Sequence, residues 1–163
     1  MKNVSEIIIN GENLKNILEA HREWLNNNGG KCANLSYADL HDARNIPNYV
    51  LAITCILPAG DIIGWKKCNN NIIVKMKIPA NANRSNSTGR KCRAEYVKVL
   101  ALYAGASLEE LSADTIAVTD NHGPKTEYQK GKIVKCDQWD NDRWQECSGG
   151  IHFFTTRYEA ENY

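Results

Sequence analysis

The sequence contains no apolar run that approaches the roughly 18–20 residues of a membrane-spanning helix. Its longest apolar run, from Tyr49 to Pro58, has the length of a buried strand. The first residues lack a basic-then-apolar pattern because Asn3, Ser5 and Glu6 interrupt it, so we expect no signal peptide. These absences exclude the usual membrane-protein classes, and we expect no membrane among the partners.

The sequence also lacks an excess of one charge and any paired cysteine motif. Its 20 basic and 19 acidic residues give a net charge of +1, whereas non-specific DNA binding requires a basic excess or a basic stripe. We therefore expect no DNA partner. The six cysteines include no Cys-x-x-Cys pair, and we interpret them as reduced thiols, mostly buried, with a disulfide framework as the alternative. At 163 residues the chain suits one domain with a small appendage.

Residues 1–30 are predicted to form a short strand and a helix. The strand is expected at Val4–Ile9, and Asn10-Gly11 supplies a turn. A helix is predicted from Glu12 to Asn26, because one face collects Leu14, Ile17, Leu18, His21 and Leu25. We expect His21 to pack on that face rather than to bind a ligand.

A five-residue periodicity follows in residues 31–52. Ala33-Asn34-Leu35 and Ala38-Asp39-Leu40 are the same triplet five residues apart, and Ala43 begins a weaker copy. The segment resembles the pentapeptide repeat, A-(N/D)-L-x-x, in which each unit forms one side of a square β-solenoid with Ala and Leu inside. Stacked coils are needed to bury a core. Two clear units are too few, so we predict a vestigial pentapeptide-repeat turn beside the main domain.

Residues 53–163 are predicted to form a C-terminal α+β domain with a mostly antiparallel, twisted sheet and short helices. Residues 51–57 are apolar and are expected in a strand. A hairpin is predicted for Ile62–Cys68 and Ile72–Ile78, because apolar and basic residues alternate in the second segment. Further strands are expected at 94–103, 115–119, 126–135 (broken by a turn at Gly131) and 150–154. For 94–103 a short helix is the alternative, and the alternation of Val97 and Val99 favours a strand.

Two short helices are predicted from capping chemistry. Ser107 and Thr156 each precede a Glu by three residues, at Glu110 and Glu159, which is the pattern of a capping box.

The loop from Ala80 to Arg93 is the first candidate binding site. Guanidinium groups, an ammonium and hydroxyls are groups that hold a phosphate or a carboxylate. We predict that it binds an anion through Arg84, Ser87, Thr88, Arg90, Lys91 and Arg93. The spacing of glycine and lysine does not fit a Walker loop. The alternative is a solvated connection whose charges pair with acids elsewhere.

The segment from Arg143 to Tyr163 is the second candidate. We predict that Trp144, His152 and Tyr163 come together near the basic loop, as a pocket for an aromatic base and its phosphates. A stacked base adds roughly 1–3 kcal/mol per aromatic ring.

Cysteine chemistry offers two alternatives in the same segment. Cys147 could form a nucleophile pair with His152 or His122, or Cys147 and His152 could bind zinc together with Cys92 or Cys136. Because no two of these ligands have finger or knuckle spacing, we expect no metal. Cys147 fits equally a small buried side chain ahead of a strand, and His152 fits a core histidine, so we expect no complete catalytic set and no cofactor.

Several motifs occur in an order that carries a resemblance over nearly the whole chain: I-I-I-N-G-E-N-L-K, the pentapeptide segment, I-I-G-W-K-K-C, I-P-A-N-A-N-R-S-N-S-T-G-R-K-C-R and W-Q-E-C-S-G-G-I-H-F-F-T-T-R-Y-E-A-E-N-Y. The chain resembles an uncharacterised family of phage and prophage proteins, often labelled pentapeptide-repeat-containing, with a C-terminal domain of unknown function. Its repeat region is truncated by comparison. The resemblance implies a viral or prophage origin and a host cytoplasm.

A looser resemblance concerns Gly150–Phe154 and Ala160–Tyr163, which are similar to the G-I-Y-F-A…S-A-N-Y segment of poly-ADP-ribose polymerases. In that family the segment lines the nicotinamide pocket. The resemblance implies that Tyr163 stacks on a ring and that His152 and Ala160 replace a Tyr and a Ser. No counterpart of the later catalytic Glu is present, which implies nucleotide binding without turnover.

We therefore expect a non-enzymatic phage protein that binds a small anionic ligand, a nucleotide signal of host immunity, and sequesters it. One alternative is an enzyme that uses Cys147 and His152 or acts on an ADP-ribose-type nucleotide. Another is a protein–protein inhibitor of a host factor. A homo-oligomer is left open.

Overall fold

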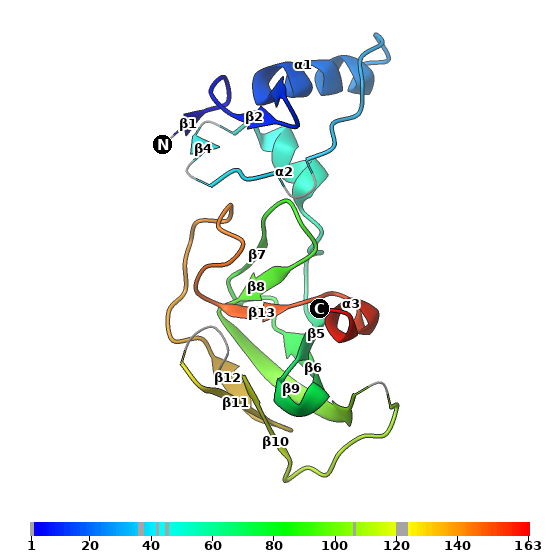
Figure 1. The fold of residues 1–163 in the computed structure, drawn as a ribbon, viewed down its shortest axis with the longest axis vertical. Helices are drawn as coiled ribbons and strands as arrows, with labels where there is room; N and C mark the ends of the chain where they lie inside the picture. The colour runs from blue at the N-terminus through cyan, green and yellow to red at the C-terminus, as the bar shows by residue number, and fades with distance from the viewer. Residues whose placement is uncertain (1, 36–37, 42, 45, 106, 120–123) are drawn as a thin grey trace.

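The computed structural model describes residues 2–35, 38–41, 43–44, 46–105, 107–119 and 124–163. A smaller N-terminal part lies at one end of the molecule and a larger sheet domain at the other (Figure 1). Each part has its own hydrophobic core. The predicted α+β class, with an N-terminal helix and mostly antiparallel sheets, is confirmed.

The N-terminal part contains two helices and two small strand pairs. β1 (Lys2–Asn3) pairs in parallel with β4 (Ala43–Arg44), and β2 (Ile8–Ile9) pairs antiparallel with β3 (Glu12–Asn13). The strand predicted at 4–9 is therefore confirmed only at its end, because residues 4–6 form a turn. The predicted helix is α1 (Leu14–Leu25), which begins where the Asn13 side chain accepts a hydrogen bond from the Lys15 amide.

The leucines of the five-residue periodicity are buried, and the described residues from 31 to 41 form no helix or strand. Leu35 and Leu40 are 4% and 0% exposed, and both belong to the N-terminal core. The carbonyl of Leu35 accepts from the Ala38 amide, and the carbonyl of Leu40 accepts from the Ala43 amide, at 3.1 and 3.0 Å. Among the described residues of 31–47, β4 is the only strand, and it does not form a solenoid coil.

The strand predicted for residues 51–57 is wrong, because α2 (Asn48–Thr54) is a helix and residues 55–57 belong to no strand. Pro47 precedes it with φ −60°, as a helix start allows. The buried residues, Val50 and Thr54, are four apart, and the Thr54 hydroxyl donates to the Val50 carbonyl at 2.7 Å. A short apolar run is compatible with a strand or with a helix, and here it forms a helix because one helical face is buried.

The larger part is built on a four-stranded antiparallel sheet with the order β12-β9-β6-β5. The predicted hairpin is confirmed as β5 (Ile62–Lys67) and β6 (Ile72–Ile78), joined by η1 (Asn69–Asn71). The other strands are β9 (Tyr96–Ala104) and β12 (Ile133–Lys135).

A second sheet has the order β13-β8-β7, and two of its strands include residues of the predicted basic loop. That loop is not irregular throughout: β7 (Arg84–Asn86) and β8 (Cys92–Ala94) pair antiparallel within it. β13 (Ile151–Phe153) pairs with β8, and Phe154 then forms two 2.8 Å backbone hydrogen bonds with Trp65 of β5. The two sheets are thereby joined, which places the C-terminal segment beside the lysines of β5.

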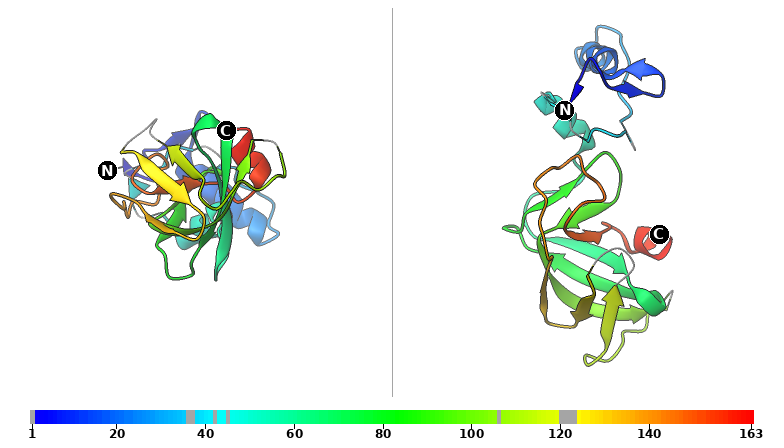
Figure 2. Two further views of the ribbon diagram at one scale, coloured as in Figure 1. Left: turned by 90° about the horizontal axis from the view of Figure 1, so that it is seen from below. Right: turned by 60° about the vertical axis from the view of Figure 1, so that its left-hand side comes forward.

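A further two-stranded ribbon lies at the end of the molecule opposite the N-terminal part (Figure 2). β10 (Ile116–Thr119) and β11 (Thr126–Gln129) form an antiparallel ribbon. The prediction for residues 126–135, two strands joined by a turn at Gly131, is confirmed by β11 and β12. The helix predicted from Ser107 is wrong: the Ser107 hydroxyl accepts from the Glu109 amide, but Glu110 then bridges to β9 at Tyr103. The segment His122-Gly123-Pro124 predicts a turn from its sequence, but it lies mostly outside the described residues.

The predicted C-terminal helix is confirmed as α3 (Arg157–Glu161), with Thr156 as its N-cap and Glu159 completing the capping box. None of the helices in the described part of the chain has the length and apolar content that a membrane crossing requires.

Candidate anion-binding site

Arg93 of the predicted basic loop is buried and binds backbone carbonyls of residues 140–149. Its side chain is 2% exposed, and its guanidinium lies 5.1 Å from the Trp139 ring centroid. Its nitrogens donate to the carbonyls of Gly149 and Asp142 at 2.6 Å and of Asp140 at 3.1 Å. A guanidinium presents five donors in a fixed fork, which suits several carbonyls at once. Arg93 therefore holds residues 140–149 against the second sheet.

Three other members of the predicted anion loop also bind protein groups. The Ser87 hydroxyl donates to the Trp144 carbonyl at 3.0 Å, and the Thr88 hydroxyl donates to the Ala38 carbonyl at 2.8 Å. Arg84 donates to the carbonyls of Pro58, at 2.8 Å, and Pro79. These bonds join the β7–β8 hairpin to neighbouring segments.

Trp144 lies at the junction of the two parts of the molecule. Its ring packs against the N-terminal core, and the Arg143 guanidinium lies 5.0 Å from the ring centroid. Arg143 also donates to the Thr54 hydroxyl at 2.8 Å, and this hydrogen bond joins α2 to the sheet domain.

Lys91 and Tyr163, by contrast, meet at the surface. The Lys91 ammonium donates to the Tyr163 hydroxyl and to the Cys147 sulfur, both at 3.1 Å, and lies 5.4 Å from the Tyr163 ring centroid. Burial lowers the pKa of Lys91, but the bonds to Tyr163 and Cys147 raise the pKa above its usual value overall. The Tyr163 ring rests on Phe154, with centroids 5.0 Å apart, and Tyr163 remains 69% exposed.

Lys66 and Lys67 of β5 approach the same C-terminal segment. Lys66 donates to the His152 carbonyl at 3.3 Å, and Lys67 donates to the carbonyls of Glu161 and Tyr163 at 3.0 and 3.4 Å. Burial lowers the pKa of Lys66, and the like charge of Lys91 lowers it further. Sequence reasoning missed Lys66, although strand alternation places it on the same face as Ile62 and Gly64, which is the inner face.

His152 lies beside this lysine cluster (Lys66, Lys67 and Lys91) but adds no charge to it. Its Nε2 lies 2.9 Å from the Ser148 carbonyl, to which it donates. Burial lowers the pKa of His152 to about 4, and the charges of Lys91, Lys66 and Arg93 contribute to the same shift. The imidazole is therefore neutral at neutral pH.

The acidic groups near the lysine cluster are paired with arginines. Glu159 accepts from Arg90 at 2.5 Å, and Glu161 accepts from Arg157 at 2.6 Å. Within the described ranges, no Asp or Glu side chain forms an ion pair with a lysine of the cluster. Partly buried ammonium groups without a carboxylate attract an anion, because their solvation by water is incomplete.

A small cavity of about 170 Å³ lies between the two parts of the molecule. Thr88, Gly89 and Arg90 at the tip of the β7–β8 hairpin line one side of it, and Leu35 and Thr54 line the other. The structure thus places the predicted anion-binding residues in three settings. Lys91, His152 and Tyr163 surround the C-terminal segment, Thr88 and Arg90 face this cavity, and Arg84, Ser87, Arg93 and Trp144 bind protein groups.

The cysteine alternatives find little geometric support. Cys147 contacts Lys91 and His152 contacts Ser148, so the two side chains have different partners. No cluster of three or more metal-ligating side chains occurs among the residues that the structure describes. All six thiols are unpaired, as predicted, but only Cys68 and Cys92 are buried, so the expectation that most are buried was wrong.

No curated protein and no solved structure matches the chain. One family model, described as "Family of unknown function (DUF5758)", matches residues 53–160, from the end of α2 to α3. This match spans more than half of the sequence and includes the lysine cluster, and the chain therefore belongs to this family of unknown function.

Proposed function

We propose that the protein binds a small phosphorylated ligand at the lysine cluster, with Tyr163 beside it. The observation that carries the proposal is the placement of Lys66 and Lys91 around the C-terminal segment without a carboxylate partner. Phosphate oxygens are strong acceptors for ammonium donors. An anion between these groups would offset both the burial and the repulsion by Lys91 that lower the pKa of Lys66.

The exposed Tyr163 ring makes a nucleotide the favoured form of this ligand. Phe154 supports the ring and the Lys91 ammonium holds its hydroxyl, so the side chain is fixed before a ligand arrives. A fixed aromatic side chain loses little entropy when a base stacks on it, and stacking adds roughly 1–3 kcal/mol. The resemblance to phage proteins supports a narrower form of the proposal, in which the ligand is a nucleotide signal of host immunity and the protein sequesters it.

Calorimetric titration with ADP and, separately, with inorganic phosphate tests this proposal. Lys91→Met should abolish binding of both, because it removes the ammonium that meets the phosphate. Tyr163→Ala should weaken ADP binding about tenfold and phosphate binding much less, since stacking concerns only the base. Lys98→Met, at an exposed lysine of β9, is the matched control and should leave both affinities unchanged.

A thermal-shift measurement gives an independent readout. Ligand at about a hundredfold excess over Kd should stabilise the native state by about 2.7 kcal/mol. Equal stabilisation of the wild-type protein and of Lys91→Met by ADP would show that the anion binds elsewhere. An absence of ADP and phosphate binding by the wild-type protein would refute the proposal.

A further inference from the structure

β12 is the last strand of the four-stranded sheet, and one of its edges faces away from β9. The Lys132 carbonyl accepts from the Val99 amide, and the Cys136 amide donates to the Glu95 carbonyl, both at 2.9 Å. Backbone groups alternate in direction along an antiparallel strand. The amides and carbonyls of Ile133 and Lys135 therefore point outward, away from β9.

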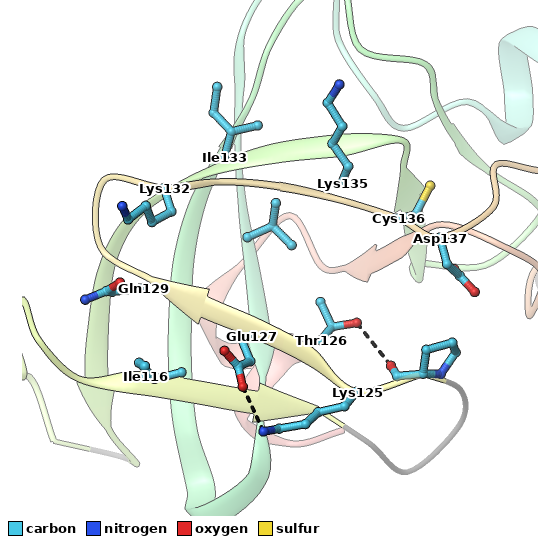
Figure 3. A pocket seen from close by; sticks show the side chains of 12 residues that line it. Ile116, Lys125, Thr126, Glu127, Gln129, Lys132, Ile133, Lys135, Cys136 and Asp137 are labelled. Atoms are coloured by element: carbon cyan, nitrogen blue, oxygen red, sulfur yellow. Dashed lines mark hydrogen bonds and ion pairs between the residues drawn. The ribbon is translucent and has the colours of Figure 1, made fainter.

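A slot-shaped cavity of about 520 Å³ borders this edge. Figure 3 shows β11 and the segment that contains β12 on two sides of the slot, with Ile133 and Lys135 on one side and Thr126 and Glu127 on the other. In the described part of the chain, β11 pairs only with β10, so β11 and β12 do not pair with each other. The volume is in the range of sites that hold a small ligand or a short peptide segment.

The side chains around the slot combine exposed isoleucines with lysines. Ile133 is 63% exposed and Ile116 is 49% exposed, although strand isoleucines are usually buried. Lys132 and Lys135 flank Ile133, and neither has a carboxylate partner among the described ion pairs. Lys125 is paired with Glu127 across 2.7 Å.

The neighbouring sheet face extends the positive charge. Ile133 lies opposite Lys98 of β9, and Lys98 lies opposite Lys77 of β6. Like charges in directly opposed positions destabilise a sheet. Of Lys98 and Lys77, only Lys77 has a carboxylate partner among the described ion pairs, which is Asp61 at 2.8 Å. An acidic partner would relieve this repulsion.

We propose that the slot between β11 and β12 receives an extended acidic segment of a partner protein, which adds a strand to the edge of β12. The outward amides and carbonyls of Ile133 and Lys135 would pair with its backbone. Its apolar side chains would cover Ile133 and Ile116, and its carboxylates would meet Lys132 and Lys135. This mode of recognition takes its affinity from main-chain hydrogen bonds and its specificity from alternate side chains.

Two other occupants fit the surface less well. A second copy of this chain, paired through the same edge, would bring Lys132 and Lys135 of both copies close together without adding a carboxylate partner. A single-stranded nucleic acid requires open aromatic rings for stacking. On this sheet face the Arg157 guanidinium lies 4.8 Å from the Tyr103 ring centroid and 5.8 Å from that of Trp65, and Lys75 also covers Trp65.

Fluorescence anisotropy with a labelled eight-residue peptide of alternating Val and Glu tests this inference, with a ten-nucleotide oligo-dT as the competing probe. Lys135→Ala removes the charge but keeps the outward amide, and it should weaken peptide binding a few-fold. Lys135→Pro removes the charge and the amide, and it should weaken binding roughly a further tenfold. Proline is tolerated where the strand amide faces outward, and circular dichroism checks that the variant folds.

Hydrogen exchange of the wild-type protein needs no variant. The peptide should slow exchange at the Ile133 and Lys135 amides and leave the Val134 amide unchanged, because Val134 already pairs with Val97 of β9. Equal affinities of the Ala and Pro variants, or unchanged exchange at saturating peptide, would overturn the inference. So would an absence of peptide binding, or oligo-dT binding that is tighter than peptide binding and lost in Lys98→Ala.

Discussion

The Lys91 ammonium and the Tyr163 hydroxyl lie 3.1 Å apart, although 72 positions separate the two residues in the sequence. Two features create this contact. β13 pairs with β8, which brings the C-terminal segment beside the β7–β8 hairpin, and the capping box then begins α3 directly after Phe154. The geometry of the proposed anion site therefore depends on α3, which ends two residues before Tyr163.

Thr156→Ala should weaken both α3 and the site. The Thr156 hydroxyl accepts from the Glu159 amide, and loss of an N-cap costs about 1 kcal/mol. A frayed α3 releases Tyr163 from Lys91, so ADP affinity should fall while phosphate affinity changes less. Urea unfolding and calorimetry measure the two effects. Thr115→Ala, just before β10, is the control and should change stability by less than about 0.5 kcal/mol. If Thr156→Ala is less stable but binds ADP with unchanged affinity, the anion site does not depend on α3.

Lys66→Met should change stability and binding in opposite directions. Burial lowers the pKa of Lys66, which means that the folded protein disfavours its charged form. An apolar side chain of similar length removes this cost, and we expect stability to rise by about 1 kcal/mol. The same change removes a cation from the cluster, so phosphate affinity should fall. A destabilised variant with unchanged affinity would assign Lys66 a purely structural role.

His152 should make stability depend on pH under mildly acidic conditions. Its pKa is about 4 in the folded protein against 6.5 for an unperturbed histidine. Between these values the unfolded chain binds more protons, so the contribution of His152 is complete above pH 6.5 and is lost as the pH falls toward 4. After a discount for solvent screening, the loss is on the order of 2 kcal/mol.

The matched variant is His152→Gln, which can still donate to the Ser148 carbonyl but does not titrate. Its stability, measured by urea unfolding at pH 4 to 7, should vary less with pH than that of the wild-type protein. Parallel profiles for the two proteins would show that other groups cause the pH dependence.

The fold could be predicted where local chemistry and periodicity agree. The alternation of Val74, Met76 and Ile78 identifies β6, and Thr156 with Glu159 identifies the start of α3. The α2 helix escaped prediction because a short apolar run has no period of its own. Ser107 has the chemistry of a cap, but Glu110 instead bridges to β9, so tertiary pairing overrides the local signal there.

The candidate site was predictable only in part. Lys91, His152 and Tyr163 were named from the sequence, and the structure does gather them around one segment. Arg93 resembles the other cations of its loop in sequence, and only tertiary structure shows that its partners are backbone carbonyls. Carbonyl partners have no sequence signature, so composition alone cannot separate an anion-binding arginine from one that holds a loop.

The buried leucines of the five-residue periodicity give a stability prediction. Leu35→Asp and Leu40→Asp each place an unpaired carboxylate in the N-terminal core, where the native side chains are 4% and 0% exposed. We expect each change to cost about 3 kcal/mol or more. Leu108→Asp is the matched control, because Leu108 is exposed. If thermal unfolding of Leu35→Asp or Leu40→Asp resembles that of the control, the leucines do not support this core.

Arg93→Met should release residues 140–149 from the second sheet. Three partly buried carbonyls lose the Arg93 donor, although Gly149 keeps the Asp140 amide at 3.4 Å. A buried acceptor left without a partner costs about 1–3 kcal/mol, and the loop will move and recover part of this loss in water. We therefore expect a net loss of about 2–4 kcal/mol in urea unfolding and faster hydrogen exchange across 140–149. Cys147 lies in this loop, so its contact with Lys91 should also loosen, and phosphate affinity should fall less than in Lys91→Met.

Arg84→Met, which removes bonds to the carbonyls of Pro58 and Pro79, is the matched control and should leave exchange in 140–149 unchanged. If Arg93→Met instead kept its stability and lost phosphate binding as completely as Lys91→Met, Arg93 would be an anion ligand, as its sequence context first suggested.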